Sequence, residues 1–280
     1  MTPLLAAWHR YVLSEQVTPQ VNGRSVLLGD HTHVVKDGGR MPSVVSLRET
    51  SETQQKPSYF RGQCWGALGL IVGSVRACFC LPLELRLHQG FVHRGEPAPA
   101  NPASRATLGE RMVEMALTFA YQHELLTWLV LDAFFASAKV FQIARSLWRL
   151  TDQQPYVHVL MRAKKNYVGY YPAPAKPPGR PGAQATYGDK VHLYECFDHR
   201  PLFESIECQV YGQSEIVQVM SENLLWRPLG DYVRFIWAVT SRGPIVLMSS
   251  DLTLSPATAI ELYCLRTRIE LMFSVLKTLL

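Results

Sequence analysis

Ser25-Val-Leu-Leu-Gly-Asp30 and Thr127-Trp-Leu-Val-Leu-Asp132 are the stretches that decide the fold, because in each an apolar run leads directly to an aspartate. The first lies in a strand predicted for residues 24–35, and the second is a short buried strand. Further strands are predicted at 63–75, 77–87, 156–161, 191–196, 206–211, 216–219, 234–240 and 245–249, and helices at 107–123 and 133–150. The alternation predicts an α/β fold with acids at strand ends.

The chain ends in a stretch of helical spacing with four polar residues on one stripe. A single helix is predicted from Ser255, its N-cap, onward. At about 100° per residue, Tyr263, Arg266, Glu270 and Lys277 lie within about 60° of one another. The apolar residues Leu262, Leu265, Ile269, Met272, Leu276 and Leu279 fall mostly on the other side. One acid is therefore expected among three phosphate-binding donors on a helix that packs on a core.

Composition sets broad limits on the protein class. The 280 residues are 48% hydrophobic and 18% charged, which is enough to bury a core, and a net charge of +5 gives a mild positive bias. The six cysteines form no CxxC pair, so a structural zinc site is disfavoured and reduced thiols are expected. Neither a signal peptide nor a membrane-spanning run is predicted, which favours a cytoplasmic protein.

Three acids stand out by position: Asp30 within or at the end of the first strand, Asp132 at the end of a later buried strand, and Glu270 on the last helix. Carboxylates that converge from separate elements are what a phosphoryl-transfer site needs to hold two divalent cations about 3.5–4 Å apart around a phosphate. Mg²⁺ suits such oxygen ligands because it keeps several waters and takes few protein carboxylates. This layout is that of an RNase H-like metal nuclease.

The order Tyr-x2-Arg-x3-Glu-x6-Lys in residues 263–277 resembles the signature of DDE transposases of bacterial insertion sequences, in particular the insertion-sequence-four group. The stretches at 29–32, 35–42, 51–59 and 62–66 are similar to the first-aspartate region of these enzymes, and 129–136 to the second. Residues 162–166, 179–181, 187–188 and 250–254 resemble stretches that lie between the second acid and the last helix. The similarity covers nearly the whole chain.

The resemblance implies an RNase H-like mixed sheet flanked by helices, with an all-β insertion before the catalytic helix. The implied activity is that of a transposase: metal-dependent endonuclease cleavage at the ends of a mobile element, followed by strand transfer, which is DNA recombination. Asp30, Asp132 and Glu270 would be the catalytic residues and the metal ligands. The expected cofactor is Mg²⁺, as two ions, with Mn²⁺ able to substitute.

DNA is the partner that the resemblance implies, as transposon terminal inverted repeats and target DNA, with a homodimer in the synaptic complex and a location at the bacterial nucleoid. The implied DNA-binding residues are Tyr263, Arg266, Lys277, Lys164 and Arg180. Trp226 and Trp237 lie in the β-rich insertion, where either a stacking contact with an unpaired base or a place in the β core is open, and the core is favoured.

Four segments are expected: an N-terminal remnant at 1–22, the first part of the catalytic core at 23–165, a β-rich insertion at 166–250 and the catalytic helix at 251–280. Only 29 residues precede Asp30, and the chain stops three residues after Lys277, where the family continues. The sequence is therefore expected to be truncated at both ends. A catalytically inactive remnant that only binds DNA is the alternative function.

Each motif also has an ordinary structural interpretation. Asp30 could cap a strand or turn, Asp132 could be the N-cap of the next helix, and Glu270 with Arg266 could be a simple helix salt bridge. A lesser alternative function is a metal-dependent hydrolase that uses His31 and His33, because two imidazoles at i and i+2 of a strand share a face and bind zinc well. That function needs further ligands at later strand ends.

Overall fold

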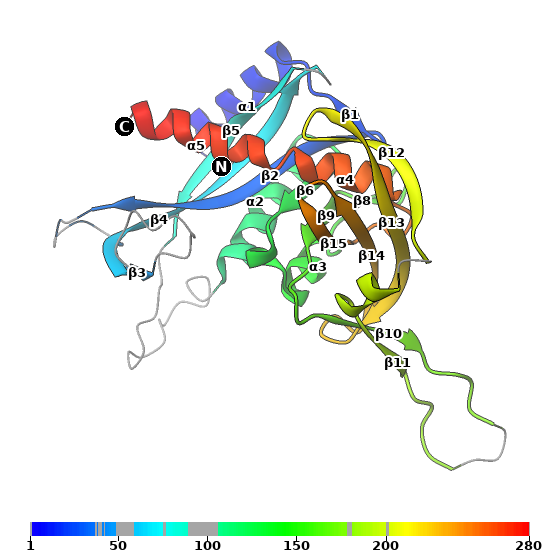
Figure 1. The fold of residues 1–280 in the computed structure, drawn as a ribbon. Coiled ribbons are helices and arrows are strands. Elements are labelled where there is room, and N and C mark those ends of the chain that lie inside the picture. Colours follow the sequence, from blue (N-terminus) through cyan, green and yellow to red (C-terminus); the bar gives the residue numbers. More distant parts are fainter. Residues whose placement is uncertain are drawn as a thin grey trace.

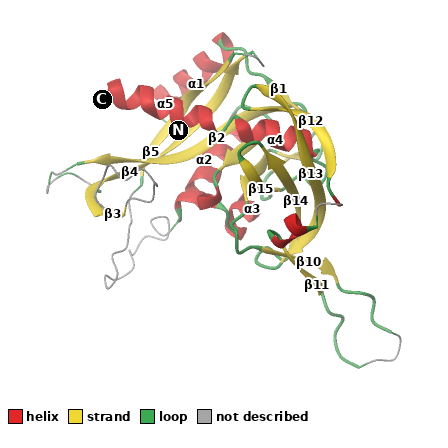
Figure 2. Ribbon diagram, viewed as in Figure 1, coloured by secondary structure: helices red, strands yellow, loops and turns green. Residues whose placement is uncertain are grey.

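The computed structural model describes residues 2–36, 38, 41, 43–48, 59–74, 77–88, 106–177, 181–199 and 202–279. These residues form a mixed α/β fold around one sheet of thirteen strands, with helices on both of its faces (Figure 1 and Figure 2). The α/β class and the mixed sheet predicted from the sequence are confirmed. None of the helices within these ranges is long and apolar enough to cross a bilayer.

The elements follow one another in three groups along the chain. The first group is α1 (Pro3–Glu15), β1 (Gln20–Val21), β2 (Arg24–Val35), β3 (Val45–Arg48), β4 (Tyr59–Gly73) and β5 (Cys78–Leu87). The second is α2 (Leu108–Gln122), β6 (Thr127–Leu131), η2 (Ala133–Phe135), α3 (Ala138–Ala144), β7 (Trp148–Arg149), β8 (Gln154–Pro155) and β9 (Val157–Arg162). The third is β10 (Val168–Pro172), β11 (Tyr187–His192), η3 (Glu195–Asp198), β12 (Glu204–Val210), β13 (Gln213–Trp226), β14 (Asp231–Thr240), β15 (Gly243–Ser249), α4 (Pro256–Cys264) and α5 (Thr267–Leu279).

Three parallel strands, β2, β6 and β9, form the centre of the sheet. Leu28 pairs with Val130 between β2 and β6, and Val130 pairs with Leu160 between β6 and β9. On the other side of β2, the long strand β4 runs antiparallel and pairs in turn with β3 and β5. The carboxyl ends of β6 and β9 and the last residues of β2 that pair with β6 therefore lie next to one another, at the edge where open α/β sheets usually bind their ligands. Beyond this level, β2 continues to Val35 beside β4.

The β-rich part of the chain extends this same sheet. β15 runs antiparallel to β9, with Met248 opposite Met161, and β14 and β13 follow it outward. The β10–β11 hairpin then projects from the molecule beyond β13 (Figure 1). The strands predicted at 206–211, 216–219, 234–240 and 245–249 are confirmed as parts of β12 to β15, whereas the run at 191–196 leaves β11 and turns into η3.

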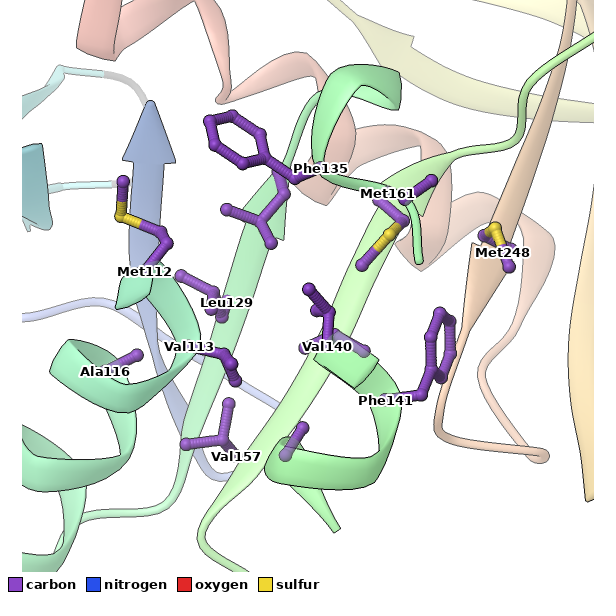
Figure 3. Packing of buried hydrophobic residues seen from close by; sticks show 14 of the residues in the cluster. Met112, Val113, Ala116, Leu129, Phe135, Val140, Phe141, Val157, Met161 and Met248 are labelled. Atoms are coloured by element: carbon purple, nitrogen blue, oxygen red, sulfur yellow. The ribbon is translucent and has the colours of Figure 1, made fainter. Parts of the chain in front are cut away.

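Each face of the sheet is covered by its own helices. On one face, Met112 of α2 and Val140 of α3 pack in one cluster with Leu129 of β6 and Met161 of β9 (Figure 3). On the other face, α4 and α5 cover a second cluster, in which Trp128 of β6 is completely buried. Burial on both faces explains why the central strands are continuous apolar runs in the sequence.

Gly29 sets the distance between β2 and α2. A Cβ atom at this position would lie only 2.6 Å from Met112 Cγ and 2.6 Å from Leu131 Cδ2. Because side chains alternate along a strand, the next residue, Asp30, lies on the opposite face with Leu28, where α5 packs. Gly29 thus lets α2 approach β2 closely, and Asp30 turns its carboxylate toward α5.

The last helix is divided, which corrects the prediction of a single helix after Ser255. Ser255 does cap α4, and its side chain accepts a hydrogen bond from the backbone N–H of Thr258. The chain then turns at Leu265 and Arg266, whose N–H groups bond to carbonyls only three residues earlier, before α5 begins at Thr267. A tight turn of this kind keeps the polar residues roughly on one side of the chain. The periodicity of the sequence therefore did not reveal the break between α4 and α5.

Three further segments differ from or complete the sequence prediction. The helix predicted at 133–150 is wrong, because η2, α3 and the small strand β7 share this segment. Helix α1 was not predicted, although Thr2 caps it and Pro3 begins it. Trp226 and Trp237 are both buried, and the indole N–H of Trp237 donates to the carbonyl of Leu193 at 2.5 Å. The core role favoured for both tryptophans is confirmed.

Candidate active site

Asp30 and Asp132 lie at the same level of the sheet. Leu28 pairs with Val130, so continuing this parallel register by two residues sets Asp30 opposite Asp132. Alternation places both on the face of the sheet that α4 and α5 cover. The carboxylate of Asp30 accepts the backbone N–H of His31 at 2.8 Å, and that of Asp132 accepts the backbone N–H of Ala133 at 2.7 Å.

The turn between α4 and α5 brings Glu270 and its neighbours to these two acids. Arg266 donates through Nη1 to Asp30 Oδ2 at 3.5 Å and through Nη2 to Glu270 Oε1 at 2.6 Å. The hydroxyl of Tyr263 donates to Asp132 Oδ1 at 3.4 Å. Arg266 thereby links the carboxylates of Asp30 and Glu270, Tyr263 contacts that of Asp132, and the charge of Asp132 acts on Asp30.

Burial controls the electrostatics of Asp30, whose side chain is only 16% exposed. Removal from water raises the pKa of Asp30 to about 6, and the nearby charges of Asp132 and Glu270 act in the same direction. The His31 N–H and the Arg266 guanidinium oppose this rise without cancelling it. A buried acid that lacks full compensation by its surroundings is typical of a functional site.

Asp30→Asn is expected to stabilise the metal-free protein at neutral pH. The pKa of Asp30 is raised from 3.8 to about 6 by folding, so the folded state binds this proton more tightly, and its contribution to stability is lost as pH rises through that range. Between about pH 4 and about pH 8, the free energy of unfolding of Asp30→Asn should therefore rise relative to that of the wild type by about 2–3 kcal/mol. Urea unfolding in EDTA at both pH values measures it; a constant difference would contradict the burial of this charge.

The two donors of the cluster respond to the same acids. Burial lowers the pKa of Arg266, but the charges of Asp132, Tyr263, Glu270 and Asp30 outweigh that effect and raise it. Burial also raises the pKa of Tyr263, and Asp132 adds to the rise. Arg266 is therefore a fixed positive charge and Tyr263 a fixed hydroxyl donor at the pH of the cell.

Arg162 is a member of the site that the sequence prediction missed. Val130 pairs with Leu160, so the register places Arg162, the last residue of β9, level with Asp132 on the same face. Burial lowers the pKa of this arginine, but Tyr194, Tyr263 and Asp132 act against it and leave the pKa raised. The signal was present, because Arg162 follows the buried Leu160 by two residues, as Asp30 follows Leu28.

The other predicted DNA-binding residues lie outside the cluster. Lys277 is exposed on α5, about two turns beyond Glu270. Lys164 follows β9 and places its ammonium 5.9 Å from the ring centre of Tyr167. Arg180 lies outside the described residues, as do most of residues 35–42 and 51–59. The assignment of Lys277, Lys164 and Arg180 to DNA stays a prediction.

His31 and His33 share a face of β2, as their spacing predicts, with ring centres 5.3 Å apart. Their surroundings are aromatic: the rings of Phe134 and Phe135 lie 4.7 and 5.5 Å from that of His31. Within the described ranges, no group of three or more His, Cys, Asp or Glu side chains is arranged to hold a metal ion. The further ligands that the hydrolase alternative needs are therefore not found in this part of the chain.

Asp30, Asp132 and Glu270 also do not form such a group as they stand. A cation is already present among them, because Arg266 lies between Asp30 and Glu270. The donor set itself suits Mg²⁺ or Mn²⁺, because it consists of hard carboxylate oxygens on three separate elements. Asp30 is buried and lacks enough positive charge to keep its pKa low. These residues fit a divalent cation in their chemistry, provided that the Arg266 guanidinium moves aside.

Comparison with known proteins adds little to this geometry. No protein-family model matches the chain, and no curated protein matches it significantly. Among solved structures, the chain is similar to the crystal structure of the NurA nuclease from Sulfolobus solfataricus, with a TM-score of 0.32 and 7% sequence identity over 99% of this chain and 93% of that chain. A TM-score this low establishes neither a common fold nor a common activity, so the functional argument rests on the chain's own residues.

Proposed function

We propose that this protein is the catalytic core of a DDE transposase, which cuts DNA by metal-dependent phosphoryl transfer. The observation that carries the proposal is the convergence of Asp30, Asp132 and Glu270 from three elements far apart in the sequence, together with Arg266 and Tyr263. Each position was expected from the resemblance before any geometry was considered. Structural caps and a local salt bridge would not require all five to meet.

An RNase H-like core is the finer fold that we propose for the centre of the sheet. Its support is the strand order β5-β4-β2-β6-β9, in which three parallel strands are extended on one side by antiparallel ones. Helices cover both faces, and two of the acids lie on neighbouring parallel strands, Asp30 within β2 and Asp132 directly after β6. The β10–β15 region would then be the β-rich insertion, added to the edge of β9.

The chain's own residues suggest how the reaction would be organised. Asp30, Asp132 and Glu270 would hold Mg²⁺ or Mn²⁺, which when bound activates the attacking water or 3′-hydroxyl and stabilises the leaving oxygen. Tyr263 orients the carboxylate of Asp132 by its hydrogen bond. Arg266 and Arg162 are the cations nearest to the acids, and a guanidinium binds phosphate oxygens in a bidentate way.

Nicking of supercoiled plasmid DNA by the purified chain tests this proposal. We expect nicking with Mn²⁺ or Mg²⁺, none in EDTA, and loss of nicking in Glu270→Gln, which keeps the size of the side chain and removes its charge. DNA binding without nicking under both metals would contradict the proposed enzyme and favour a remnant that only binds DNA. Nicking that survives in Glu270→Gln would place the activity outside the cluster.

A further inference from the structure

Arg266 has two predicted partners that it cannot bind at once. Its Nη1 and Nη2 atoms are directed at Asp30 Oδ2 and Glu270 Oε1, at 3.5 and 2.6 Å. Under the proposed function, the same guanidinium binds a DNA phosphate, and the same two carboxylates bind a metal ion. Both nitrogens that a bidentate phosphate contact would use are occupied by the acids in this structure.

The position of Arg266 in the cluster is that of an internal counter-ion. Its side chain is 18% exposed, and Asp30 beside it is 16% exposed, so this ion pair is largely removed from water. The buried carboxylate of Asp30 and the exposed carboxylate of Glu270 would repel each other without a cation between them, and the repulsion acts most on Asp30, which is largely removed from water. A divalent cation bound to Asp30 and Glu270 would need the place that this guanidinium fills.

The local structure leaves room for the guanidinium to leave. Arg266 is the residue at which α4 has ended and α5 has not begun, so its backbone is held by bonds of a tight turn and not by a continuous helix. Glu270, the outer partner, is 54% exposed, so the pair opens to solvent on that side. A change of side-chain rotamer would carry the guanidinium from the acids toward solvent without unfolding either helix.

We propose that Arg266 is an exchangeable counter-ion, which neutralises Asp30 and Glu270 in the metal-free protein and is transferred to a DNA phosphate when a divalent metal binds. This inference rests on the proposed function and adds a regulation to it. Metal and DNA then bind with positive cooperativity. The metal displaces Arg266 from the acids and frees it for a DNA phosphate, and DNA that binds Arg266 leaves the acids free for the metal. DNA that accepts the arginine therefore strengthens metal binding, which favours cleavage in the bound complex.

Calorimetric titration with Mn²⁺ tests the exchange without any measurement of activity. In the absence of DNA, Arg266→Gln should bind Mn²⁺ about fivefold or more tightly than the wild type, since the competing cation is gone. Arg266→Lys should fall between the two, because an ammonium is a single point charge without the fork. In the wild type, Mn²⁺ should strengthen binding of a short DNA duplex, and in Arg266→Gln this effect of Mn²⁺ should be smaller.

Lys190→Gln is the matched control, because it removes one positive charge from an exposed residue of β11, at the far end of the sheet from the three acids. Its affinity for Mn²⁺ should equal that of the wild type. An Mn²⁺ affinity of Arg266→Gln that is equal to or weaker than that of the wild type, or equally raised in Lys190→Gln, would overturn the exchange. Should Arg266→Gln fail to fold, Arg266→Lys carries the test, and an unchanged Mn²⁺ affinity in it would overturn the exchange.

The failure of this inference differs from a failure of the proposed function. If the wild type binds Mn²⁺ and loses this binding in Asp132→Asn, the metal site stands whatever Arg266 does. If the wild type shows no Mn²⁺ binding that depends on Asp132, the proposed function and the exchange are both overturned.

Discussion

Asp132→Asn is expected to reduce metal-dependent nicking on the order of a thousandfold or more, because a neutral amide replaces a carboxylate ligand at the metal. The fold should survive this change. An Asn Oδ1 atom still accepts the backbone N–H of Ala133 and the hydroxyl of Tyr263, the two hydrogen bonds that Asp132 Oδ1 makes in the structure. Initial rates of plasmid nicking at saturating Mn²⁺, compared at equal protein concentration, give the size of the effect.

The matched control for that loss is Asp198→Asn, which removes the same charge from an exposed residue of η3. Nicking by Asp198→Asn should stay within about twofold of the wild type, as expected for an exposed surface residue. A similar loss in both variants would show that net charge, and not a metal ligand, had been changed. Activity retained in Asp132→Asn with an unchanged melting temperature would remove Asp132 from the site.

Trp128→Ala should lower the free energy of unfolding by about 3–5 kcal/mol, the largest stability effect that we expect from one side chain. Trp128 is fully buried in β6, and its ring stacks on His158 with centres 5.3 Å apart. Its indole N–H also donates to the carbonyl of Val21 at 3.0 Å, so truncation leaves both a cavity and an unpaired acceptor. Because Trp128 lies four residues before Asp132, activity should be lost with the fold.

Trp148→Ala is the comparison that isolates burial. Trp148 is 47% exposed, although its indole N–H likewise donates to a backbone carbonyl, that of Arg145 at 2.8 Å. We expect a loss below about 1 kcal/mol for this variant. Equal losses for the two tryptophans in urea unfolding would mean that Trp128 does not lie in the core of the sheet.

The strands and their acids were predictable because the residues that determine them are close together in the sequence. The apolar run before Asp132 forms β6, and the apolar run before Asp30 lies in β2, which has the predicted bounds of residues 24–35. Thr107 and Glu110 form the capping box of α2, so the helix at 107–123 was also found with nearly correct ends. These signals depend only on neighbours within a few residues.

Other features depend on contacts that a single stretch of sequence does not contain. The break at Leu265 and Arg266 replaces a helix that periodicity favours, and what the turn gains is the contact of Arg266 with Asp30, 236 residues away in the chain. Arg162 was missed for a related reason: its membership of the site comes from the parallel register of β9 with β6. The convergence of the three acids was an expectation of the resemblance, and the contact of Arg266 with Asp30 was not foreseen.

Crystals of the metal-free protein soaked in Mn²⁺ test the central claim most directly, because anomalous scattering locates the metal itself. The account predicts a Mn²⁺ peak in contact with the carboxylates of Asp30, Asp132 and Glu270, with the Arg266 guanidinium displaced from Asp30 and Glu270. Arg266 still paired with both acids, with no Mn²⁺ peak among the three carboxylates at saturating metal, would contradict it.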